Sequence, residues 1–174
     1  MAILEAALRL LERHGYARMS VEAVAAEAGT TKAAVYRRHR GKAELATAAL
    51  AFLREQRAPR ESDDPRADLL EELRRFRQGI ERRHGVAMLG TVLAEEEHVP
   101  ELLAAFRRDV VAPRRARLRA ILERARLRDG LDPETAVHMA VGSYYAAYLA
   151  AGPPARGWER RVADALLGPR NGAA

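Results

Sequence analysis

The sequence contains no cysteine, which excludes disulfide bonds, thiolate metal sites and cysteine nucleophiles together. Aromatic residues make up only 5% of the 174 residues, so a core has to be built mainly from leucine, valine and alanine. These residues favour helices where their spacing allows it, and we expect an all-α fold. No export leader is recognised in "MAILEAALRLLERHG", because charges recur every few residues, and we expect a cytoplasmic protein.

Long apolar runs are also missing. The segment from Ala136 to Ala151 is nearly apolar, but His138, Ser143 and three tyrosines interrupt it, and a membrane span needs about 20 uninterrupted apolar residues. We therefore expect no membrane partner. The net charge of +6 is typical of a protein with a polyanionic partner, although an alanine- and arginine-rich composition produces it too.

The residue patterns that enzymes require are scarce. No glycine-rich phosphate loop is present, and Ser20, Ser62 and Ser143 lack the strand-to-helix setting of an activated nucleophile. Glu95 and His98 have the Glu-x-x-His spacing of di-iron helical bundles, but such a site needs two copies and two further glutamates. An exposed acidic helix end explains this motif equally well, so we expect no enzyme, metal or cofactor.

Helix signals in the N-terminal part are closely spaced. Apolar residues over 3–13 recur at helical intervals up to Gly15. Ser20 predicts the N-cap of a second helix that Gly29 closes, and Thr31 predicts the cap of a third. Gly41 precedes a fourth helix, 42–57. Since only a tight turn fits between the second and third helices, they cross steeply, as in a helix-turn-helix.

The third helix lies in "TTKAAVYRRHRGK", residues 30–42. If Ala34 and Val35 face inward, hydroxyl, phenol and guanidinium groups are left facing out, and these suit phosphates and guanine edges. A polar face that only keeps the protein in solution is the alternative.

The segment "ILEAALRLLERHGYARMSVEAVAAEAGTTKAAVYRRHRGKAEL", residues 3–45, resembles the N-terminal domain of the tetracycline-repressor (TetR/AcrR) family of bacterial transcription regulators. The resemblance implies a three-helix helix-turn-helix DNA-binding domain over residues 1–46. It also implies a C-terminal helical ligand-binding and dimerisation domain over residues 47–174.

The resemblance assigns roles by position. Ser20 and Thr31 would bind phosphates, Lys32 would reach a base or phosphate, and Lys42 would hold the flanking phosphate. His39 replaces a usual aromatic residue, and is either a buried, hydrogen-bonded histidine or an added phosphate contact. The full set expected at the DNA is Ser20, Thr30, Thr31, Lys32, Ala33, Tyr36, Arg37, His39 and Lys42.

Further helices follow an acidic, proline-containing connector at 58–65. Asp64 with Pro65, and Asp132 with Pro133, predict helix starts, and Trp158 to Leu167 predicts a final helix. Pro113 lies inside a long helix from Pro100 to about Arg128 and should bend it.

The helix after Pro133 has a side of small residues, which permits close helix–helix approach and predicts a dimer seam. That seam comprises Ala136, Ala140, Ser143, Ala147, Ala151, Trp158, Val162 and Leu166. The tyrosine side predicts an effector pocket, with plain core as the alternative. Its expected lining is Phe76, Met88, Val92, Phe106, Val110, Met139, Tyr144, Tyr145 and Tyr148.

The expected function is therefore a ligand-responsive homodimeric repressor that binds a palindromic operator and is released by a small apolar or aromatic effector. A non-specific architectural DNA-binding protein is the rival interpretation, since it shares the charge argument.

Overall fold

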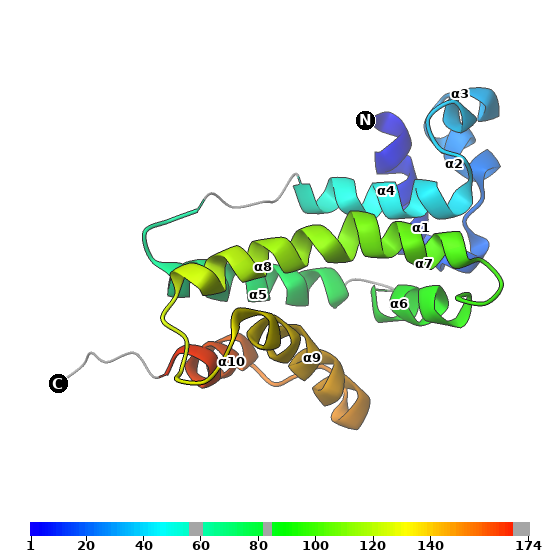
Figure 1. Cartoon of the computed structure of the whole chain (residues 1–174). Coiled ribbons are helices and arrows are strands. Elements are labelled where there is room, and N and C mark those ends of the chain that lie inside the picture. The colour runs from blue at the N-terminus through cyan, green and yellow to red at the C-terminus, as the bar shows by residue number, and fades with distance from the viewer. Residues whose placement is uncertain (56–60, 82–84, 169–174) are drawn as a thin grey trace. The chain divides into compact units, whose positions relative to one another are not determined.

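The regular structure of the described residues is helical. A computed structural model describes residues 1–55, 61–81 and 85–168, and no strand occurs within these ranges (Figure 1). This confirms the predicted all-α fold. The chain divides into two compact units: unit 1 comprises Met1–Ala58 and Ile80–Pro113, and unit 2 comprises Pro59–Gly79 and Arg114–Ala174. The predicted domain boundary after residue 46 stays a prediction.

Unit 1 is built around two adjacent helices, α1 and α4; α2 and α6 pack on α1, α7 and η1 pack on α4, and α3 packs on α2. Its core consists mainly of leucine, valine and alanine, as the shortage of aromatic residues requires. The elements of unit 1 are α1 (Ala2–Arg18), α2 (Val21–Glu27), α3 (Lys32–Tyr36), α4 (Lys42–Glu55), α6 (Gly85–Ala94), α7 (Pro100–Phe106) and the π-helical turn η1 (Arg107–Val111).

Gly15 and Gly29 have positive backbone φ angles in unit 1. Gly29 has a φ of 63° directly after α2, a left-handed conformation that few other residues adopt without strain. Gly15 has a φ of 73° and kinks α1, but the helix resumes and ends only at Arg18. The predicted end of the first helix is thus a kink.

Pro113 disturbs the helix that contains it. Its missing N–H cannot complete the regular hydrogen bond to the preceding turn. The chain widens into η1 immediately before α8 (Ala112–Arg124), so the disruption takes the form of a π-helical turn. The helix ends four residues before the predicted Arg128.

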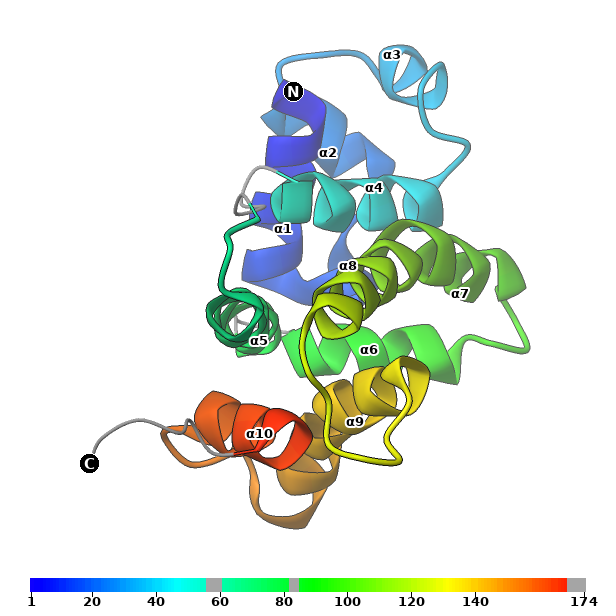
Figure 2. The same cartoon turned by 60° about the vertical axis from the view of Figure 1, so that its left-hand side comes forward.

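Unit 2 contains α5 (Pro65–Ile80) up to Gly79, α8 from Arg114, α9 (Pro133–Ala151) and α10 (Trp158–Leu167). The aspartate caps are confirmed, because Asp64 Oδ1 accepts from the amides of Arg66 and Ala67, and Asp132 Oδ1 accepts from those of Glu134 and Thr135. Figure 2 shows α9 and α10 side by side.

Arginines connect the helices of unit 2. Arg124 donates to the Asp68 carboxylate over 2.6 Å and to the Ser62 carbonyl over 2.9 Å, which joins α8 to the start of α5. Arg66 of α5 pairs with Asp164 of α10 and donates to the Gly168 carbonyl over 2.8 Å.

No helix in the described part of the chain combines the length and apolarity that a membrane crossing requires.

Candidate DNA-binding surface

Two capped helices and a glycine turn form the candidate reading head. The Ser20 Oγ accepts from the Ala23 amide over 3.1 Å at the start of α2, and the Thr31 Oγ1 accepts from the Ala34 amide over the same distance at the start of α3. Both predicted N-caps are confirmed. Each hydroxyl uses its oxygen for the cap, so its O–H remains able to donate to a phosphate.

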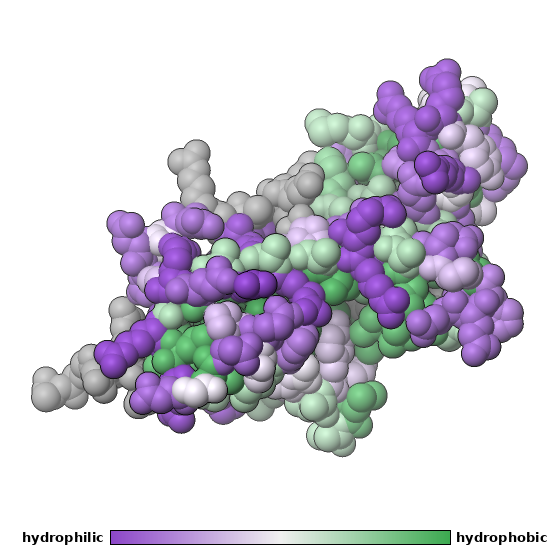
Figure 3. All heavy atoms as spheres, in the orientation of Figure 1, coloured by the Kyte–Doolittle hydropathy of each residue, from purple (hydrophilic) through white to green (hydrophobic). Residues whose placement is uncertain are grey.

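One buried side chain sets the orientation of α3. Val35 is fully buried, as is Val24 of α2, whereas Ala34 is half-buried. Five of the residues expected at the DNA are exposed in α3 or next to it: Thr31, Lys32, Ala33, Tyr36 and Arg37. Thr30 and Ser20 are half-buried at the turn and the cap. Figure 3 shows hydrophilic side chains gathered over the α2–α3 end of unit 1.

An acidic side chain also lies on this face. Glu22, in the first turn of α2, forms an ion pair with Lys32, the first residue of α3. The hydrogen bond between them lowers the pKa of Glu22 and raises the pKa of Lys32, so both groups are charged at neutral pH. The Lys32 Nζ also lies 5.7 Å from the centroid of the Tyr36 ring. This contact was not predicted from the sequence, since the two residues are ten positions apart on different helices.

Two family models match the chain in succession. Residues 3–49 match bacterial regulatory proteins of the tetR family, and residues 59–166 match the tetracyclin repressor-like C-terminal domain. The chain belongs to the TetR family. Its N-terminal part matches the family's DNA-binding domain, and the matched family and the curated relatives are helix-turn-helix transcription regulators rather than enzymes.

Relatives agree with the family. Uncharacterized HTH-type transcriptional regulators of Mycobacterium bovis and Mycobacterium tuberculosis are 38% identical over 126 residues, which cover 71% of this chain. The chain spans 60% of the length of these curated relatives. The crystal structure of the TetR family transcription regulator SCO0332 superposes with a TM-score of 0.74 at 27% identity, covering 94% of this chain and 91% of that one.

A more distant structure shares the fold. FadR from Bacillus subtilis, solved in complex with stearoyl-CoA, has a TM-score of 0.66 at 18% identity and covers 97% of this chain and 98% of its own.

Lys42 of this TetR-family chain links α4 to α1. Its ammonium donates to the Ala17 carbonyl over 3.0 Å and lies 4.4 Å from the centroid of the Tyr16 ring. Partial burial lowers its pKa. The ammonium has further N–H donors, so the expected phosphate contact stays a prediction, and the structure adds a positioning role that the sequence did not indicate.

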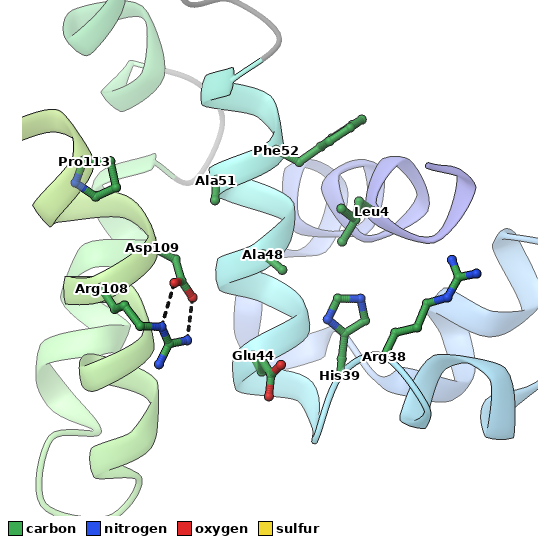
Figure 4. Close-up of a pocket in the computed structure, with 10 residues that line it drawn as sticks. All are labelled: Leu4, Arg38, His39, Glu44, Ala48, Ala51, Phe52, Arg108, Asp109 and Pro113. Carbon is green, nitrogen blue, oxygen red and sulfur yellow. Dashed lines mark hydrogen bonds and ion pairs between the residues drawn. The ribbon is translucent and has the colours of Figure 1, made fainter. Parts of the chain in front are cut away.

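His39 lines an open cleft in unit 1 (Figure 4). The cleft has a volume of about 480 Å³ and is lined by Leu4, Arg38, His39, Glu44, Ala48, Ala51, Phe52, Arg108, Asp109 and Pro113. The imidazole is half-buried, and this burial lowers its pKa, so the ring is largely neutral at pH 7. His39 is thus a partly buried side chain in this cleft, and the expected phosphate contact stays a prediction.

The predicted pocket residues fall into separate units. Val92, Phe106 and Val110 belong to unit 1, and the side chain of Met88 lies outside the described residues. In unit 2, Phe76 meets the Tyr144 ring edge-on with centroids 5.4 Å apart and the Tyr145 ring with centroids 5.8 Å apart. Tyr148 stacks on Tyr144 at 6.4 Å. Met139 is 47% exposed and lies outside this aromatic cluster, which corrects its assignment to the pocket wall.

Most of the predicted dimer seam is core instead. Ala136, Ala140, Trp158, Val162 and Leu166 are buried within the single chain, so they offer almost no surface to a partner. Trp158 joins the aromatic cluster, with its ring centroid 5.4 Å from that of Tyr144, and its indole N–H donates to the Ser143 hydroxyl over 3.2 Å. Ser143 and Ala147 are half-buried, and Ala151 is exposed. α9 packs against α10 of the same chain.

Proposed function

We propose that this TetR-family regulator is a ligand-responsive repressor that binds a palindromic operator as a homodimer and leaves it when a small apolar or aromatic effector binds. The observation that carries the proposal is the orientation of α3. Val35 is fully buried, while Lys32, Tyr36 and Arg37 are exposed together. Such a face offers ammonium, phenol and guanidinium donors to phosphates and guanine edges at once.

An exposed apolar face of α9 supports the proposed dimer. Met139 and Leu149 are 47% and 86% exposed, and Gly142 and Ala146 are exposed between them. Their spacing of three, four and three residues is that of a helix–helix seam. We assign the homodimer contact to this α9 stripe, Met139, Gly142, Ala146 and Leu149, because exposed apolar side chains in a regular row are typical of a covered surface.

The aromatic cluster of unit 2 supports an apolar effector. Phe76 and Tyr144 are buried, whereas Tyr145 and Tyr148 are half-buried, and the three tyrosines carry hydroxyls. Aromatic walls with a few hydroxyls are typical of sites for apolar or aromatic molecules. The distant relative FadR was solved with stearoyl-CoA, which agrees with this chemistry. Binding can release DNA only if the effector prefers the conformation that fits the operator less well.

DNA-binding measurements separate this proposal from the architectural rival. Fluorescence anisotropy would compare the DNA upstream of the protein's own gene with a scrambled duplex of equal length and composition at moderate salt. A repressor binds the upstream DNA about 10³-fold or more tightly than scrambled DNA, the lower end of usual specificity ratios. Equal affinities that fall together as salt rises would favour the architectural protein.

The effector is tested separately. Long-chain acyl and aromatic compounds would be screened for a rise in the thermal unfolding midpoint, since a ligand that binds only the folded state stabilises it. A true effector also weakens binding to upstream DNA. Arg37→Ala is the matched control, because it should lose DNA binding and keep the thermal shift. A compound that shifts the midpoint but leaves DNA affinity unchanged would contradict the regulatory role.

A further inference from the structure

The α2–α3 reading head contains two acidic residues, and they differ in what they contact. Glu27 is held by Arg9 over 2.7 Å and also pairs with Arg13, so it fastens α2 to α1. Glu22 pairs instead with Lys32 at the start of α3. Both partners are more than half exposed, with 59% of the Glu22 side chain and 54% of the Lys32 side chain accessible.

Stability does not account for this pair. Exposed ion pairs add little to stability, because water and salt screen them and ordering the side chains costs entropy. A carboxylate on a surface that approaches DNA is also repelled by the phosphates. A specific partner on the DNA would offset this cost, and bases offer such partners in the major groove.

We propose that the Glu22–Lys32 pair reads one G·C base pair in each half of the operator, an inference that rests on the proposed binding of α3 in the major groove. Guanine presents two adjacent acceptors, N7 and O6, and cytosine presents the N4 amino donor beside them. The ammonium of Lys32 donates to the guanine acceptors, and the carboxylate of Glu22 accepts from the cytosine amino group.

The arrangement also rejects other base pairs. In the same orientation an A·T pair turns the adenine amino group toward the ammonium and the thymine O4 toward the carboxylate, so donor meets donor and acceptor meets acceptor. The carboxylate then has no partner on the DNA, and the phosphates repel it. Specificity at this position comes from repulsion as much as from attraction.

In vitro selection from random duplexes tests the assignment. It would use the full chain as wild type, Glu22→Gln, Lys32→Gln and Asp129→Asn. The last is a control: Asp129 is exposed in unit 2, and its substitution raises the net charge by one, as Glu22→Gln does. Circular dichroism would confirm that each variant is folded. Selected sites would then be measured by anisotropy.

The expected result is one G·C position in each half-site whose preference falls about tenfold or more in Glu22→Gln, because the amide has both a donor and an acceptor and accepts A·T as well. Lys32→Gln should relax the same position, and Asp129→Asn should keep it. The inference is overturned if Glu22→Gln raises affinity for all sequences by the same factor as Asp129→Asn and alters no position. It is also overturned if Lys32→Gln relaxes a different position. If the wild type selects no sequence at all, the proposed operator binding fails as well, which distinguishes the two failures.

Discussion

A single buried side chain fixes the rotation of α3 about its axis, and so decides which residues of the proposed DNA-binding surface are exposed. The helix has only five residues, and Val35 is its single fully buried side chain. Tyr36 and Arg37 follow it directly and are exposed. Because both side chains are exposed, their replacement should change the free energy of unfolding little. Tyr36 does contact the Lys32 ammonium.

Arg37→Ala is expected to weaken operator binding about 5- to 150-fold, since a guanidinium contact to a base or phosphate contributes about 1–3 kcal/mol. Tyr36→Ala should act in the same direction. Electrophoretic mobility shifts with the upstream DNA measure the loss, and analytical ultracentrifugation measures the dimer. Loss of the dimer in either variant would show that these residues hold the subunits together rather than read DNA.

The start of α5 depends on a buried carboxylate. Asp68 is buried, accepts from the Ser62 hydroxyl over 2.7 Å and pairs with Arg124 over 2.6 Å. Burial alone would raise the pKa of Asp68, but hydrogen bonds from Ser62 and Arg124 outweigh it and hold this pKa below the ordinary value of 3.8. Folding therefore favours the ionised form.

Asp68→Asn is expected to lower the free energy of unfolding by about 2 kcal/mol at pH 7, the usual contribution of charge-assisted hydrogen bonds. Because the folded-state pKa is depressed, this contribution is present above the unfolded pKa and is lost as pH falls through the folded value. Urea unfolding at pH 7 and near pH 3 measures the change. Asp63→Asn, an exposed neighbour, is the control. A difference between wild type and Asp68→Asn that grows on acidification would have the wrong sign.

Local sequence signals predicted most helix boundaries. The caps at Ser20, Thr31 and Asp132 depend on residues two or three positions away, so the sequence carries the whole interaction. The Glu22–Lys32 pair joins two helices across a turn. Only the crossing of those helices brings the two side chains together, and no spacing rule indicates it.

The face of α9 could not be predicted for a related reason. Small and apolar residues occur all around this helix, so periodicity gives little contrast between its sides. The buried side centres on Ala136, Ala140 and Tyr144, between the two sides expected from the sequence. α10 packs on α9, and only this tertiary contact determines that the row from Met139 to Leu149 is exposed.

Association of the molecule should therefore depend on the α9 stripe. Leu149→Glu is expected to dissociate the dimer, because it places a charge in an apolar seam that a partner would have to desolvate. Leu93→Glu is the matched control, since Leu93 is 52% exposed on α6 and outside that seam. Size-exclusion chromatography with light scattering measures both. An unchanged dimer in Leu149→Glu would place the interface elsewhere.

The proposed repression by a homodimer requires two copies of the α2–α3 reading head on one operator. The most direct measurement is hydroxyl-radical footprinting of the selected operator, combined with the number of chains bound per duplex. The account predicts two chains and two protected half-sites with centres about one helical turn, roughly 34–36 Å, or a multiple of it apart, with both protections lost in Arg37→Ala. The account would be contradicted if a single chain bound the operator with the full affinity, or if the protected positions did not recur at helical-turn spacing along the duplex.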